Sequence, residues 1–193
     1  MPALALAPTI AIGVSEVATR HNDAGFTDSP DEPYRGGRKL HLDVGLKIGP
    51  DLALNLHGGV STKATQSTSY FSGPEIYDPV VSIPFHFKPY ELGIGVTATT
   101  HRVWFAPWIG IVAVHVSDLH TYDHVTFSGS TGFGLGCEVG FDVFVQQHHR
   151  VAVFVEGTYS KLRSGDEPGP GEGFTTLGAS LTQFGVGLAY RYF

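Results

Sequence analysis

Three carboxylates, Glu138, Asp142 and Glu156, share one side of two segments in which apolar and polar residues alternate. Paired carboxylates can exchange protons as general acid and base. The same side also carries cationic residues, and a buried charge is costly unless an opposite charge pairs with it. The pattern therefore favours an internal ionic network over a catalytic pair, and we assign it to Lys39, Asp43, Lys47, His57, Glu138, Asp142, Glu156 and Arg191.

The tripeptide His115-Val116-Ser117 offers a hydroxyl nucleophile with a base close by in the chain. Nucleophilic catalysis needs the base within hydrogen-bonding reach of the nucleophile, and a third group that orients the base. The sequence assigns no such third group. We therefore predict no catalytic residue, and His115 and Ser117 are the candidates should the protein be an enzyme.

The chain contains ten histidines, and imidazole together with carboxylate suits zinc or copper. His41 and His57 lie in neighbouring alternating segments. A second group gathers at one polar connection and the strand end before it, and comprises His115, His120, His124, Asp118 and Asp123. Neither group presents four ligands at close spacing, so we predict no metal site and no cofactor.

The composition excludes several classes of protein. The 193 residues carry a net charge of −6, which excludes the basic footprint of a nucleic-acid-binding protein, and one cysteine excludes a disulfide framework. Only 16% of the residues are charged, yet no run of 18 apolar residues exists that could form a transmembrane helix. Low charge, 25 glycines and no long apolar run are typical of a membrane β-barrel.

Strict alternation of apolar and polar residues predicts β-strands, because successive side chains of a strand point to opposite faces. The pattern is clearest at 40–48, 52–61, 131–145, 151–160 and 183–192, where no helical period fits. In the third of these segments Phe144 falls on the polar side. Three less regular segments, 9–19, 90–100 and 103–116, bring the number of strands to eight; Pro107 suggests a bulge in the last, or a strand that starts after it.

The connections between these strands alternate in length. Short ones lie at 49–51, 101–102 and 146–149, and long polar ones at about 20–37, 63–88, 117–130 and 162–180. Short turns at one end and long loops at the other are typical of outer-membrane barrels. Residues 80–88 could extend a strand or form a fifth hairpin, which would give ten strands, but Pro84 and Pro89 argue against a strand there.

Three features indicate that the aliphatic face contacts lipid. The polar face is rich in glycine, which fits the narrow interior of a small barrel. Its charges have both signs, as an internal network requires. Aromatic residues gather near strand ends, where they would form the interfacial girdles: Tyr90, Trp104, Trp108, Phe133, Phe141, Tyr159, Phe184, Tyr190 and Tyr192. The alternative is a soluble β-sandwich or a lipocalin-like barrel with the apolar face inside.

Residues 131–193, from Gly-Phe-Gly-Leu-Gly-Cys-Glu-Val-Gly to Gln-Phe-Gly-Val-Gly-Leu-Ala-Tyr-Arg-Tyr-Phe, resemble the last three strands of small outer-membrane barrels: the OmpA N-terminal domain, OmpX, OmpW and the opacity proteins. Phe105-Ala106-Pro107-Trp108 resembles the start of a middle strand in that family. The resemblance implies a closed, antiparallel, eight-stranded up-and-down barrel in the bacterial outer membrane. It also implies a C-terminal signal for the insertion machinery at Tyr190 and Tyr192, with Phe193 as one extra residue.

We expect residues 1–193 to form one such domain, with both termini on the periplasmic side and a lumen filled by the ionic network. Residues 1–8 lack the basic start of a secretory signal, so this interpretation predicts a mature form from which the signal has been removed. The expected function is structural, with surface recognition through the long loops. Its partners would be the lipid bilayer, lipopolysaccharide, the insertion machinery and an extracellular ligand, but not nucleic acid.

Two alternative functions stay open. The first is a narrow passage for small or apolar solutes. The second is an enzyme that modifies lipid A, because some outer-membrane deacylases carry a His-x-Ser motif. In that family the motif lies on the penultimate strand, whereas here that strand reads Val-Glu-Gly-Thr-Tyr-Ser and has no histidine.

Overall fold

The computed structural model describes residues 6–22, 35–62, 64–71, 80–117, 130–162 and 180–193. Every regular element among them is a β-strand. In this part of the chain we find no helix that is long and apolar enough to cross a membrane.

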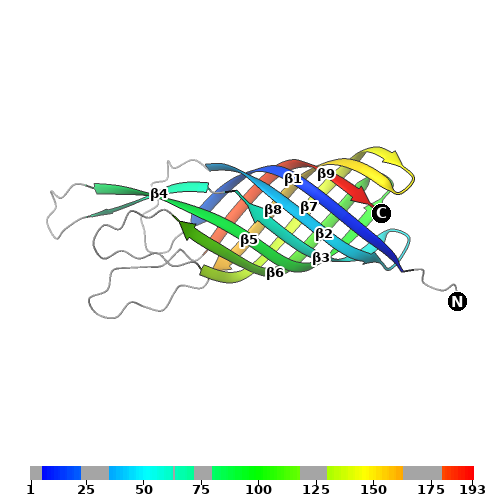
Figure 1. Ribbon diagram of the computed structural model, residues 1–193, viewed down its shortest axis with the longest axis horizontal. Helices are drawn as coiled ribbons and strands as arrows, with labels where there is room; N and C mark the ends of the chain where they lie inside the picture. Colours follow the sequence, from blue (N-terminus) through cyan, green and yellow to red (C-terminus); the bar gives the residue numbers. More distant parts are fainter. Residues whose placement is uncertain (1–5, 23–34, 63, 72–79, 118–129, 163–179) are drawn as a thin grey trace.

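Eight long strands form a closed antiparallel barrel (Figure 1). Neighbours in the sheet are neighbours in the chain, except that β9 pairs with β1 and β3 pairs with β5, which closes the ring. The predicted eight-stranded up-and-down barrel is thus confirmed. Its strands are β1 (Ala7–Asn22), β2 (Arg35–Lys47), β3 (Leu52–Ser61), β5 (Val80–Thr100), β6 (Val103–Ser117), β7 (Ser130–Gln146), β8 (His149–Leu162) and β9 (Ser180–Tyr192).

A ninth strand, β4 (Ala64–Phe71), lies outside the closed ring and pairs only with the first part of β5. Figure 1 shows it at the end of the barrel opposite the two chain ends. The sequence interpretation placed a loop here, which is wrong, and so is the count of ten barrel strands. Residues 80–88 extend a strand, as one of the two alternatives held.

Pro84 and Pro89 lie inside β5, although proline was expected to exclude a strand. Proline cannot donate to a ladder, but each of these two has a registered neighbour on one side only. Pro84 pairs with Ser67 of β4, and Pro89 pairs with Val114 of β6. Pro89 marks the place where β5 changes its other partner from β4 to β3. The missing N–H groups therefore fall where β5 lacks a second ladder.

The irregularities of β6 and β7 also differ from expectation. At Pro107 there is neither a bulge nor a strand start: the ladder to β5 is interrupted there and then resumes in the same register. The register shift lies in β7 instead, between Asp142 and Phe144. It turns Phe144 outward, where 53% of its surface is exposed, so the assignment of Phe144 to the polar face is wrong.

Large apolar side chains cover the outside of the barrel. They alternate along each strand with buried residues, so that aliphatic positions face out and small or polar positions face in. We call this exposed set the aliphatic belt; it includes Ile12, Leu42, Leu56, Leu92, Ile109, Val139, Val155 and Leu188. Soluble domains do not leave so much contiguous apolar surface in water.

Tight turns close the barrel at the end where β1 begins and β9 ends (Figure 1). Two of them have two residues each, His101-Arg102 and Gln147-His148. The first residue of each lies in the left-handed region, with φ of 54° at His101 and 53° at Gln147. Two-residue hairpin turns require this conformation, because only a turn of that hand matches the twist of the strands.

Candidate functional site in the barrel lumen

The inward side chains form a buried polar core that runs along the barrel axis. Its centre is Lys39 on β2, which is 1% exposed. The Nζ atom of Lys39 lies 2.7 Å from Glu91 Oε2 on β5 and 2.7 Å from Glu156 Oε2 on β8. Ser15 on β1 donates a hydrogen bond to the other oxygen of Glu156. One cation thereby ties four strands together around the lumen.

His57 on β3 joins this cluster from the next strand. Its Nδ1 lies 2.8 Å from Asp43 Oδ1, and its Nε2 lies 3.3 Å from Glu91 Oε2. The imidazole stacks on the indole of Trp108, with 4.5 Å between the ring centroids and 15° between the planes. Both nitrogens and one face of the ring are therefore in contact, which holds the side chain in one orientation.

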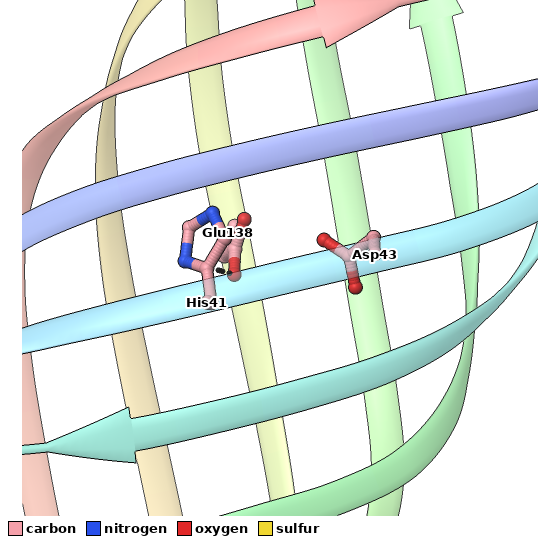
Figure 2. Close-up of side chains that lie close together, drawn as sticks. All are labelled: His41, Asp43 and Glu138. Carbon is pink, nitrogen blue, oxygen red and sulfur yellow. Dashed lines mark ion pairs between the residues drawn. The ribbon is translucent and has the colours of Figure 1, made fainter.

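His41 and Glu138 meet in the middle of the lumen from opposite walls of the barrel, since three strands lie between β2 and β7 in either direction around the ring. Figure 2 shows the two side chains next to each other, with Asp43 on the same strand as His41. Nδ1 of His41 lies 3.3 Å from Oε1 of Glu138. The angles do not make this contact a hydrogen bond, and neither nitrogen of His41 has another partner among the described residues.

A second ionic group lies nearer the end with the tight turns. Asp142 on β7 is fully buried and contacts two arginines, Nη1 of Arg150 at 2.7 Å and Nη1 of Arg191 at 3.0 Å. Arg191 also donates to Thr99 Oγ1 at 3.0 Å and lies over the Trp104 ring, 4.5 Å from its centroid. These contacts fill the lumen between β5, β7, β8 and β9.

Of the eight residues assigned to an internal network, the structure brings seven into ionic contact. The exception is Lys47, which lies over the Phe193 ring at 4.6 Å and has no ion pair among the described residues. Sequence analysis missed Glu91, His41 and Arg150 as members. Glu91 and His41 lie on the polar side of their alternating segments, so the signal was present; Arg150 sits beside a turn, where alternation says little.

Trp104 and Trp108 were expected in an interfacial girdle, and this expectation is wrong. Their side chains point into the lumen and are 3% and 6% exposed. Residues 103–116 are apolar at both odd and even positions, so alternation could not show which side chains of this segment point inward. Gly136 and Gly140 on β7 lie against the two indoles, and a Cβ atom at either glycine would overlap the ring. The glycines of the polar face thus make room for two tryptophans.

The remaining candidate residues lie away from this core. His115 is exposed near the end of β6, on the same side of the strand as Ile109 and Ile111; the side chain of Ser117 lies outside the described residues. So do His120, His124, Asp118 and Asp123. At the C-terminus, Tyr190 is exposed on the outer face, whereas Tyr192 and Phe193 are half-buried.

The ionic contacts occupy much of the lumen that the structure describes. A cavity of about 20 Å³ lies at the end with the chain termini, lined by Thr9, Asp43, Asn55, Thr97, Arg191 and Phe193 among others. This is enough for one water molecule. A charged core of this kind can cross-link the wall of the barrel, hold a small cation or retain protons.

Comparison with known proteins identifies the fold. No protein-family model matches the chain, and no curated protein matches its sequence. Solved structures do match the chain. One is Ail, the attachment invasion locus protein of Yersinia pestis, which is 14% identical and has a TM-score of 0.52; the match covers 96% of this chain and 97% of Ail. Neisserial surface protein A has 13% identity and a TM-score of 0.53, with 96% of both chains covered.

OprG, an outer-membrane protein of Pseudomonas aeruginosa, has 12% identity and a TM-score of 0.50, with 96% of this chain and 95% of that one covered. Near-complete coverage at such low identity means that the architecture is shared while the side chains differ. The chain therefore has the fold of the small eight-stranded barrels of bacterial outer membranes.

Proposed function

We propose that this protein is an integral outer-membrane barrel with a structural and surface-recognition role, its lumen closed by the ionic network. One observation carries the proposal: apolar side chains cover the outside of a closed barrel, and lysine, arginine and carboxylate side chains fill the inside. Only a surrounding bilayer makes this arrangement favourable, because closure satisfies every backbone group of the wall and lipid covers the aliphatic belt.

Basic residues on the outer rim support lipopolysaccharide as the neighbouring lipid. Arg20, Arg38, Lys88 and Lys161 occupy outward positions at the end of the barrel opposite the tight turns. Lipopolysaccharide carries phosphates at the height where such a rim would lie, and Lys and Arg bind phosphate through charge-assisted hydrogen bonds. We therefore propose the orientation in which the chain ends lie on the periplasmic side.

The charge of the long connections suggests what they recognise. Segments 23–34, 72–79, 118–129 and 163–179 hold eleven acidic residues and one basic residue, a net charge of −10. Ail, which shares the fold, was crystallised with sucrose octasulfate, a heparin analogue. The segments of this chain would repel such a polyanion, so the ligand class we propose is cationic.

Tyr190, Tyr192 and Phe193 are the proposed C-terminal signal for the insertion machinery. Tyr192 pairs with Ile10 of β1 and with His149 of β8, so the end of β9 is fully engaged in the finished barrel. A machinery that reads this segment would have to bind it before β1 pairs with it. Deleting Phe193 alone tests whether the extra residue belongs to the signal: unchanged outer-membrane levels would exclude it.

The folding state is tested on the protein itself. Purified protein in SDS should migrate faster without boiling than after boiling, because a closed barrel resists the detergent when cold. After expression in a Gram-negative host, the protein should be recovered from the outer-membrane fraction. A soluble protein with no heat-dependent shift would contradict the proposal.

Two measurements address the alternatives. In planar bilayers we expect no conductance above background, because the contacts of Lys39 and Asp142 cross the lumen; a stable single-channel current would favour the narrow passage. Expression should leave the lipid A composition unchanged. A modified lipid A that disappears in Ser117→Ala would instead assign an enzyme to His115 and Ser117.

A further inference from the structure

Three potential metal ligands converge at the centre of the lumen (Figure 2). His41 and Asp43 come from β2 and Glu138 comes from the opposite wall, and one ligand atom of each lies within 4.8 Å of the others. The distance of 3.3 Å between His41 Nδ1 and Glu138 Oε1 is close to the roughly 3.4 Å expected between two ligands of a tetrahedral ion with bonds of about 2.1 Å.

Two of these side chains are buried without a hydrogen-bond partner. His41 is 1% exposed and Glu138 is 2% exposed, and both nitrogens of His41 and Oε1 of Glu138 lack a partner among the described residues. Buried polar atoms are nearly always paired, and an unpaired one is expensive. Nδ1 of His41 and Oε1 of Glu138 face each other, so a single bound group can contact both, whereas Nε2 of His41 lies against Gly13 on the wall.

The charges around this space favour a cation. Four carboxylates surround the centre, and three of them face a basic partner: Glu91 and Glu156 contact Lys39, and Asp43 contacts His57. Glu138 has only His41 within ionic distance among the described residues. Lys39 is held between its own two carboxylates, which leaves an excess of negative charge beside His41.

We propose that His41, Asp43 and Glu138 form a binding site for one Zn²⁺ ion in the barrel lumen. One imidazole and two carboxylates are ligands that Zn²⁺ accepts in a four-coordinate site whose last position is a water. His57 Nδ1 forms a hydrogen bond with Asp43 Oδ1 at 2.8 Å, and the imidazole stacks on Trp108. These two contacts would orient the Asp43 carboxylate, although His57 itself would not bind the ion.

The small cavity at the periplasmic end provides the route for the ion. Asp43 lines this cavity, and its side chain is 13% exposed while those of His41 and Glu138 are 1% and 3% exposed. The exposed ligand therefore lies between the cavity and the two buried ones. An ion would reach Asp43 first and then His41 and Glu138.

Equilibrium dialysis of the full chain, folded in detergent micelles and stripped with a chelator, tests the site with Zn²⁺ alone. Bound zinc is measured by elemental analysis. We expect one tightly bound equivalent, which His41→Gln and Glu138→Gln each weaken at least about 100-fold, since even indirect partners of a metal contribute 10- to 100-fold. His148→Gln, in an exposed turn, is the matched control and should keep the equivalent.

Two outcomes overturn the proposal: no tight equivalent in the unaltered protein, or an equivalent that survives in both glutamine variants. Should the variants fail to fold, X-ray absorption at the zinc edge of the unaltered protein decides. One imidazole with oxygen ligands at about 2.0–2.2 Å supports the site; two or more imidazoles place the ion elsewhere.

Discussion

Lys39 shows how a charged residue can lie at the centre of a stable barrel. Taking an ammonium group out of water costs several kcal/mol, and its attraction to a carboxylate offsets this only when the geometry is good. Here two carboxylates lie at 2.7 Å, and Thr158 Oγ1 lies at 3.4 Å. Because Glu91 lies on β5 and Glu156 on β8, the two ion pairs of Lys39 hold these strands and β2 together across the lumen.

The contribution of Lys39 can be measured against an exposed pair. Lys39→Met leaves Glu91 and Glu156 buried without their cation, so we expect it to lower the free energy of unfolding by about 3–5 kcal/mol. Arg38→Met breaks the exposed ion pair with Glu16 and should cost at most about 1 kcal/mol. Urea unfolding in detergent, followed by tryptophan fluorescence, gives both values. If both variants lost the same free energy of unfolding, Lys39 would be as accessible to water as the exposed Arg38.

At the scale of the strands, glycine and tryptophan are matched across β6 and β7. Gly136 lies opposite Trp108 in the ladder, and Gly140 lies opposite Trp104. The two indoles lie over the glycines and extend into the lumen, where they contact His57 and Arg191. The wall therefore alternates between positions that supply a large ring and positions that make room for it.

A methyl group at one of these glycines should disturb the packing. Gly136→Ala places a Cβ atom against the Trp108 indole, and overpacking of this kind costs about 1–3 kcal/mol. Gly58→Ala is the control: it lies on the outer face of β3, and the nearest atom to its Cβ would be the Leu42 carbonyl oxygen at 3.8 Å, an ordinary contact. Urea midpoints of the two variants should differ clearly; a neutral Gly136→Ala would show that Trp108 can move aside.

Alternation in the sequence was sufficient to predict the strands and the side on which most residues lie. The prediction for 52–61 has the same ends as β3, because one face of that segment is aliphatic at every position except Gly58. It was insufficient for the first part of β5, where Pro84 and Pro89 hid a strand because each proline has a registered neighbour on one side only. It was also insufficient for Trp104 and Trp108, whose segment is apolar on both sides.

The sequence predicted most members of the ionic network, but not which of them contact each other across the lumen. Alternation tells that His41 and Glu138 both point inward, but which inward residues meet depends on the tilt and stagger of the strands. These are properties of the whole closed sheet, and no local pattern encodes them. The proposed zinc site could therefore be inferred only from the structure, in which β2 and β7 lie on opposite sides of the lumen.

For the whole molecule, the aliphatic belt determines where the barrel can be stable. Val139 lies in the middle of β7 and Val145 lies near its end at the turn, both exposed on the outer face. The cost of a charge on this face depends on depth, because lipid is driest at the middle of the bilayer.

Arginine substitutions at these two positions measure that depth. Val139→Arg should cost about 2–4 kcal/mol, and Val145→Arg only about 0–1 kcal/mol, because the second guanidinium can reach the interface. Reversible unfolding in lipid vesicles gives the two free energies. If Val139→Arg were neutral, the outer face would be in water and the membrane assignment would be wrong.

The pairing of β1 with β9 has a consequence for how such a chain must be made. Thirteen registered pairs, from Ile10 with Tyr192 to Asn22 with Ser180, form a seam between the two strands that are farthest apart in the chain. Until the last strand has been synthesised, the sheet has two open edges, and lipid offers them no hydrogen bonds. A nascent chain therefore cannot close its barrel in the bilayer strand by strand, and the ring forms only when β9 is available to pair with β1.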